Sequence, residues 1–118
     1  PFLHELVSNS QNIPLLILSI GIVAPVFEEV LFRGFAYKGL ERSKLGGHGT
    51  VWVIAIVFAL IHLQYSWAVK AIIIPMGVLL GYARMFSGSL LVPILLHVLN
   101  NSLGILLELQ TLEVEASF

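Results

Sequence analysis

The sequence predicts an all-α protein, a polytopic bundle of about four transmembrane helices. Apolar residues make up 58% of its 118 residues and charged residues only 11%, against about 25% charged residues in average soluble domains. Mean hydropathy is +0.95. One small soluble core cannot hide so much apolar side chain, so the surface must face lipid as well. The connections between the apolar segments are short, which favours an antiparallel bundle.

Four apolar segments are expected as helices, at Ile13 to Lys38, about Thr50 to Tyr65, about Trp67 to Phe86 and about Leu90 to Leu109. Three of them approach the ~20 residues that cross a bilayer. The second is shorter, so we expect it to tilt or to be shielded by its neighbours. We interpret residues 1–118 as a single intramembrane core domain, excised from a longer membrane protein.

The orientation follows from the basic residues. The connection Gly39 to Gly49 and the turn Ser87 to Ser89 lie on one side of the predicted bundle. That side carries Lys38, Arg42, Lys44 and Arg84. Because cytoplasmic loops are rich in Lys and Arg, we expect this side to be cytoplasmic and both chain ends to lie on the opposite side.

Composition also excludes several function classes. The chain has no cysteine, so it has no disulfide, thiolate nucleophile or zinc–thiolate site. Its net charge is −1 and it has no long basic run, which argues against a nucleic-acid partner. The lipid bilayer is the partner that the composition predicts.

Charge inside the first span is unexpected. Glu29 and Arg33 are four residues apart and share a helix face, with the glutamate first, which is the favourable order for an ion pair. Glu28 is rotated by about 100° and is left to face something else. A solvated helix end is the alternative. Against it, the apolar character continues beyond the charges to Tyr37.

Two further spans carry buried polar residues. Phe58 precedes His62 by one helical turn, and His97 shares a face with Asn101, while Asn100 is less favourably placed. Taken singly, His62 is more typical of a satisfied core histidine. His97 and the asparagines are equally consistent with a hydrogen-bonded patch between helices.

Depth along the helices favours a shared site. At 1.5 Å per residue, Glu28, His62, His97 and Asn101 all lie roughly 12–18 Å from the predicted cytoplasmic end. Three spans therefore bring polar groups to one layer of the bilayer. Two local features accompany them: Pro25 should kink or loosen the first span, and Gly77 with Gly81 should allow close helix packing.

These groups suit attack by water on a carbonyl. A carboxylate among apolar side chains can act as a general base near neutral pH, and a histidine with an amide can stabilise an oxyanion. No serine lies in a recognisable nucleophile motif. Polar groups in one layer argue against a proton or ion pathway, which would need them across the whole depth.

The motifs Glu28-Glu29-x-x-x-Arg33, Phe58-x-x-x-His62 and His97-x-x-x-Asn101 resemble those of the CAAX protease and bacteriocin-processing family, also called the Abi family. This family includes the type II CAAX prenyl endopeptidases. The resemblance covers Ile13 to about Leu107. It implies an all-helical intramembrane endopeptidase in a multi-pass membrane protein, expected in a bacterial plasma membrane with its active site nearer the cytoplasmic side.

By this resemblance, Glu28 activates water with help from His62, and His97 and Asn101 stabilise the oxyanion. Glu29, Arg33 and Phe58 support the site. The family is often labelled metalloprotease, and Glu28, His62 and His97 form a possible zinc set. No HExxH motif favours this alternative, and we expect no cofactor.

A non-catalytic immunity or scaffold protein remains the competing function. The substrate stays open among prenylated CAAX proteins, small secreted peptides and lipid-linked regulators.

Overall fold

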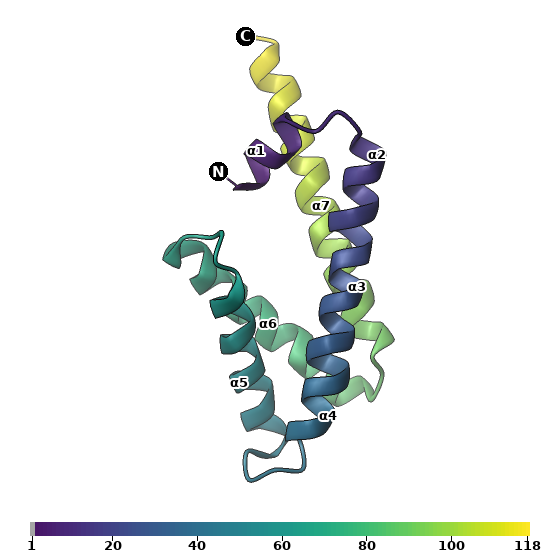
Figure 1. The fold of residues 1–118 in the computed structure, drawn as a ribbon, viewed down its shortest axis with the longest axis vertical. Coiled ribbons are helices and arrows are strands. Elements are labelled where there is room, and N and C mark those ends of the chain that lie inside the picture. The colour runs from purple at the N-terminus through teal and green to yellow at the C-terminus, as the bar shows by residue number, and fades with distance from the viewer. Residues whose placement is uncertain (1) are drawn as a thin grey trace.

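The computed structural model describes residues 2–118, and this range is helical with no strand. Three helical segments are long and apolar enough to cross a membrane: Ile13–Leu40, Trp67–Ser87 (α6) and Leu91–Ala116 (α7). A shorter apolar helix, α5, spans Gly46–Ile61. Figure 1 shows the C-terminus at one end of the bundle, the N-terminus in the same half, and the connection 41–45 at the other end. The predicted all-α membrane bundle is confirmed.

The first span is one continuous helix that changes its winding. It runs through α2 (Ile13–Leu16), a π-helical stretch η1 (Ile17–Val23), α3 (Ala24–Glu29), a second π-helical stretch η2 (Val30–Ala36) and α4 (Tyr37–Leu40). Asn12 caps its start by accepting the Leu15 N–H at 3.0 Å. The loosening predicted at Pro25 takes the form of η1, where the Ala24 N–H donates to the Ser19 carbonyl, five residues earlier.

The second helix differs from its predicted bounds of Thr50 to Tyr65. It begins at Gly46 and ends at Ile61, so the predicted connection Gly39 to Gly49 shrinks to residues 41–45. Gly47 in this first turn lets the helix approach α6, since a Cβ there would lie 2.8 Å from Met85 Sδ. His62 is therefore the first residue after the helix, with φ −76° and ψ 68°, rather than a residue within it.

The close packing predicted from small residues is present between α5 and α6. A Cβ on Gly77 would lie 3.1 Å from Ala55 Cα, and one on Gly81 would lie 2.8 Å from Val51 Cγ1. Backbone therefore packs directly on the neighbouring helix at both positions.

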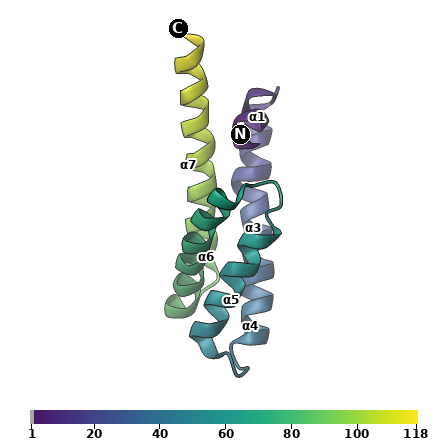
Figure 2. The ribbon, with the colours of Figure 1, turned by 90° about the vertical axis from the view of Figure 1, so that its left-hand side faces the viewer.

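The molecule has two pairs of packed helices. α7 packs along η1 and α3 of the first span, while α5 packs on α6 (Figure 2). α7 is longer than predicted and extends beyond Leu109 to Ala116, through a segment that contains the helix formers Leu112, Glu113 and Glu115.

An additional short helix, α1 (Phe2–Ser8), crosses α7 near the chain ends. Val7 packs in a buried cluster with Leu16 and Ile105, and His4 Nδ1 lies 2.7 Å from Glu108 Oε1. The sequence did not predict this helix. Its packing brings Phe2 and Leu3 toward the middle of the bundle.

Candidate active site

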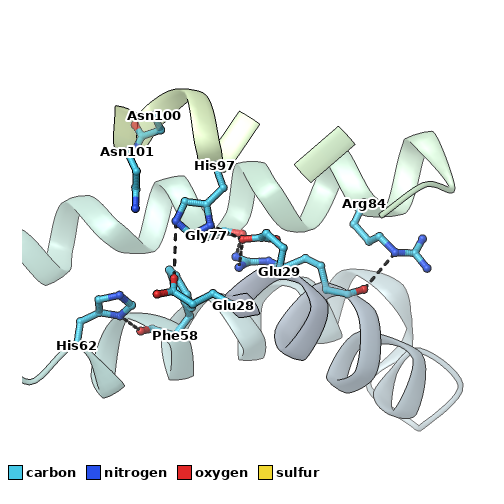
Figure 3. A network of polar contacts seen from close by, with 10 residues as sticks. Glu28, Glu29, Phe58, His62, Gly77, Arg84, His97, Asn100 and Asn101 are labelled. Atoms are coloured by element: carbon cyan, nitrogen blue, oxygen red, sulfur yellow. Dashed lines mark hydrogen bonds and ion pairs between the residues drawn. The ribbon is translucent and has the colours of Figure 1, made fainter. Parts of the chain in front are cut away.

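The two adjacent glutamates have different environments. Glu29 is fully buried, and its Oε1 accepts a hydrogen bond from Arg33 Nη1 at 3.0 Å. Glu28 keeps 27% of its side chain exposed, and its Oε2 lies 3.7 Å from His97 Nε2 (Figure 3). The helical rotation predicted for this pair is therefore present, with Glu29 in a buried ion pair and Glu28 facing outward from it.

His97 contacts both glutamates. Its Nδ1 lies 2.6 Å from Glu29 Oε1, and its Nε2 is directed at Glu28 (Figure 3). The Nδ1–H thus donates to the buried carboxylate, which fixes the plane of the ring. The imidazole is buried on α7, 3% exposed by its side chain. Spacing within one helix carried no signal for this contact between helices.

Arg33 ties three helices together. Its Nη2 donates to the Gly77 carbonyl of α6 at 2.9 Å, and its guanidinium lies 4.8 Å from the centre of the Phe58 ring on α5. With Glu29 on its own helix, these contacts hold a buried cation by an ion pair, a backbone carbonyl and an aromatic face. The sequence predicted that Glu29 and Arg33 hold the first span in place. The contacts of Arg33 with α5 and α6 were not predicted.

Phe58 packs between the two histidines. Its ring meets His62 edge-on at 4.6 Å and His97 at 5.8 Å between ring centres. His62 Nδ1 lies 2.6 Å from the Phe58 carbonyl, so this nitrogen donates and Nε2 is left free for another group. Because the helix ends at Ile61, this carbonyl is available to a side chain.

Asn101 and Asn100 come from α7, one turn beyond His97. Asn101 Nδ2 donates to the Ile20 carbonyl of the first span at 3.2 Å. Asn100, which helical spacing places less favourably, donates from Nδ2 to Asn101 Oδ1 at 3.4 Å. One N–H of the Asn101 amide is used by the backbone, and the amide has a second N–H.

A cavity of about 620 Å³ joins these groups. Glu28, His62, His97 and Asn101 all line it, so the structure brings the four predicted catalytic residues to one space. Its wall on α6 is apolar, formed by Val69, Ile72, Ile73 and Met76. A polar set of residues therefore faces an apolar wall, as in many ligand sites.

Tyr65 is a residue of this cavity that sequence reasoning missed. Its ring stacks on His62 at 6.0 Å between centres, and Phe2 of α1 meets it edge-on at 5.5 Å. Burial raises the pKa of the Tyr65 phenol, and the nearby Glu28 carboxylate raises it further. Its position only three residues after His62 is the one signal in the sequence that pointed to it.

The possible zinc set does not form a metal centre. Within residues 2–118, no three His, Asp or Glu side chains converge closely enough to hold a metal ion. Glu28, His62 and His97 share the cavity, and the Nδ1 of each imidazole donates to a protein acceptor. The side chains present therefore do not fit a metal ion.

Comparison with known proteins gives a family. The family model described as type II CAAX prenyl endopeptidase Rce1-like matches residues 10–103. The chain is 27% identical over 114 residues to the membrane-embedded CAAX protease MroQ of Staphylococcus aureus (strain USA300), covering 92% of this chain and 45% of that protein. It is 34% identical over 113 residues to an uncharacterized 24.3 kDa protein of Escherichia coli, covering 90% and 51%.

The chain thus spans about half the length of the curated relatives it matches. No solved structure matches it.

Proposed function

Because the chain belongs to the family of type II CAAX prenyl endopeptidases of the Rce1-like kind, we propose that it is the core of an intramembrane endopeptidase in which Glu28 activates water. The observation that carries this proposal is the difference between the two glutamates. Glu29 is fully buried and bonded, whereas Glu28 faces the cavity, 3.7 Å from His97 Nε2.

In the proposed reaction, a water in the cavity lies against the Glu28 carboxylate and His62. Glu28 takes one proton from the water as its oxygen attacks the carbonyl carbon of the substrate peptide bond. The carbonyl oxygen becomes an oxyanion. Glu28 then delivers the proton to the leaving nitrogen, and the carbon–nitrogen bond breaks to give an acid and an amine.

His97 and Asn101 are suited to hold the oxyanion. Buried carboxylate Glu29 anchors His97 Nδ1, so the ring presents Nε2 to the cavity without reorganisation. As an oxyanion donor His97 acts through its Nε2–H, because its Nδ1–H is used by Glu29. Asn101 contributes the N–H that Ile20 does not use.

The substrate we propose is a prenylated or membrane-embedded protein or peptide. The apolar wall formed by Val69, Ile72, Ile73 and Met76 suits a lipid-like or apolar chain beside the scissile bond. The reaction we propose uses no metal ion, and within residues 2–118 no three His, Asp or Glu side chains lie close enough together to hold one.

We also propose that the end of the bundle with the connection 41–45 faces the cytoplasm of a bacterial plasma membrane, because Lys38, Arg42, Lys44 and Arg84 lie there. Glu28 is 12 residues from Leu40 and 15 from Ile13, which supports an active site near mid-membrane and slightly nearer that side.

The test is Glu28→Gln in the full-length protein, reconstituted in vesicles and assayed with a farnesylated CAAX peptide and with a panel of membrane peptides. Loss of a general base lowers kcat by roughly 10²–10⁴-fold. Glu113→Gln is the matched control, because Glu113 is exposed near the end of α7 and outside the cavity. Retained cleavage by Glu28→Gln would remove Glu28 from the role of base. A wild-type protein that cleaves none of the peptides would favour the scaffold alternative.

A further inference from the structure

Pro25 removes a backbone donor where the first span passes α7. In η1, the Ala24 N–H donates to the Ser19 carbonyl, five residues earlier. Continuing this register would require the N–H of residue 25 for the Ile20 carbonyl. Returning to the α register would require the same N–H for the Gly21 carbonyl. Proline has no N–H, so neither carbonyl can receive it.

α7 supplies side-chain donors to both carbonyls. Asn101 Nδ2 donates to the Ile20 carbonyl at 3.2 Å, and Ser102 Oγ donates to the Gly21 carbonyl at 3.3 Å. Donors and acceptors are adjacent residues on each helix. A slide of α7 by one residue would unpair both carbonyls in an apolar environment, where an unpaired backbone group is costly.

Gly21 allows the approach that the second of these bonds needs. Gly21 is buried, and a Cβ there would lie 3.0 Å from Ser102 Oγ and 3.6 Å from Ile105 Cδ1. Gly21 therefore offers its carbonyl to the Ser102 hydroxyl and has no side chain that would keep the hydroxyl away.

We propose that Ser102 is a positioning residue for the reaction, which sets the register of α7 against the first span through its bond to the Gly21 carbonyl. This inference rests on the proposed function. Glu28 lies two helical turns after Gly21, and His97 lies five residues before Ser102, so the two helices held by this bond carry both sides of the site. A shift of α7 changes the 3.7 Å separation of Glu28 Oε2 and His97 Nε2 directly.

The first experiment is a double-mutant cycle in the full-length protein, using Ser102→Ala and Pro25→Ala. Ser102→Ala should lower kcat roughly tenfold with KM nearly unchanged, because a displacement of about 1 Å is enough to slow a reaction strongly. Pro25→Ala restores one backbone N–H, which the α register of α3 delivers to the Gly21 carbonyl, so in that background Ser102→Ala should cost less than about threefold. Ser19→Ala is the matched control, since the Ser19 hydroxyl bonds within its own helix to the Leu15 carbonyl at 2.8 Å.

Two results of this cycle would overturn the proposal. One is a wild-type kcat for Ser102→Ala. The other is an equal loss in both backgrounds, which would mean that the hydroxyl does not act through the Gly21 carbonyl.

A second measurement reads the register without enzyme activity. Leu16 and Ile105 lie in one buried cluster of the two helices, and this chain has no native cysteine. With Leu16→Cys and Ile105→Cys in the full-length protein, freed of any other cysteine, Ser102→Ala should slow disulfide formation by about threefold or more, because the bond tolerates little misalignment. Pro25→Ala should restore the rate.

An unchanged disulfide rate in Ser102→Ala would contradict the register role whatever the catalytic residues are. Conversely, an active Glu28→Gln enzyme would contradict the proposed function. The disulfide rate would still test whether Ser102 sets the register of α7. The two failures are therefore distinguishable.

Discussion

Glu29 Oε1 lies 2.6 Å from His97 Nδ1, and both side chains are almost fully buried. The same oxygen accepts from Arg33 Nη1 at 3.0 Å. One carboxylate oxygen therefore joins the cation on its own helix to the imidazole on α7. This contact makes Glu29 a support of His97 as well as a partner of Arg33.

Substitution of Glu29 should therefore lower both stability and activity, whereas substitution of Glu28 should lower activity alone. Glu29→Gln leaves the buried Arg33 without its counter-charge, which should lower the free energy of unfolding by about 3–5 kcal/mol. It should also lower kcat by roughly 10–100-fold through loss of His97 orientation. Glu28→Gln should lose activity with little change in stability. Thermal unfolding in detergent and peptide cleavage by the same samples measure both effects, and equal stability of the two variants would contradict the division of roles.

Arg33→Lys should destabilise the protein although the charge is kept. A lysine ammonium cannot reach Glu29, donate to the Gly77 carbonyl and cover the Phe58 ring with the geometry of a guanidinium. We expect a loss of about 2 kcal/mol in the free energy of unfolding, because a buried carbonyl and a ring face lose their partner. Arg42→Lys, at an exposed position of the connection 41–45, is the control.

Gly81→Ala should weaken the packing of α5 on α6. The new Cβ would lie 2.8 Å from Val51 Cγ1, so one of the helices must shift, at a cost of about 1–3 kcal/mol. Adding Val51→Ala should recover part of this loss by making room. Gly39→Ala, with no atom within 4 Å of its Cβ, should leave stability unchanged or slightly raised. Independent effects of the two substitutions would show that the contact does not limit the packing.

Tyr65 should ionise at higher pH than an ordinary tyrosine, whose pKa is about 10. Burial and the Glu28 carboxylate both favour the neutral phenol and raise its pKa in the folded protein. The contribution of the neutral Tyr65 phenol to the free energy of unfolding is fully present below the pKa that this tyrosine has in the unfolded chain. It is lost as the pH rises through its pKa in the folded protein. The difference in phenolate absorbance between wild type and Tyr65→Phe gives this pKa. Glu28→Gln should lower it only partly, since burial is the larger cause.

Activity should survive removal of metal ions. Within residues 2–118 the side chains do not converge on a metal position, so a chelator should leave kcat and KM unchanged. Metal content measured on the active protein, before and after dialysis, is the check. Loss of activity that returns on adding zinc would instead support the alternative in which Glu28, His62 and His97 bind the ion.

The sequence was informative wherever one helix decides the geometry. Spacing of four residues predicted the Glu29–Arg33 pair, and small residues four apart predicted the close approach at Gly77 and Gly81. It was uninformative about which groups meet across helices, because rotation and axial shift of each helix depend on packing. Hence the contacts of Glu29 with His97 and of Asn101 with the Ile20 carbonyl were not predicted.

Element ends were also imperfectly predicted. Glycines in the segment 46–49 are typical of a loop, yet they begin α5, and Gly47 lies where a Cβ would meet Met85 of α6. His62 was expected inside that helix and lies just beyond it. His62 belongs to the predicted motif, but its backbone lies outside the helix.

The length of α5 has a consequence for the supply of the reactant water. Its 16 residues rise about 24 Å, less than the ~30 Å thickness of the hydrocarbon layer. A helix of this length that starts at one face of the hydrocarbon layer ends inside it. This would put the polar backbone of residues 62–66 within the layer, where irregular chain is stable only against protein or water. Three of these residues, His62, Gln64 and Tyr65, line the cavity. The short helix therefore leaves a polar stretch of chain beside the cavity, and the hydrolysis proposed above would draw its water along that stretch.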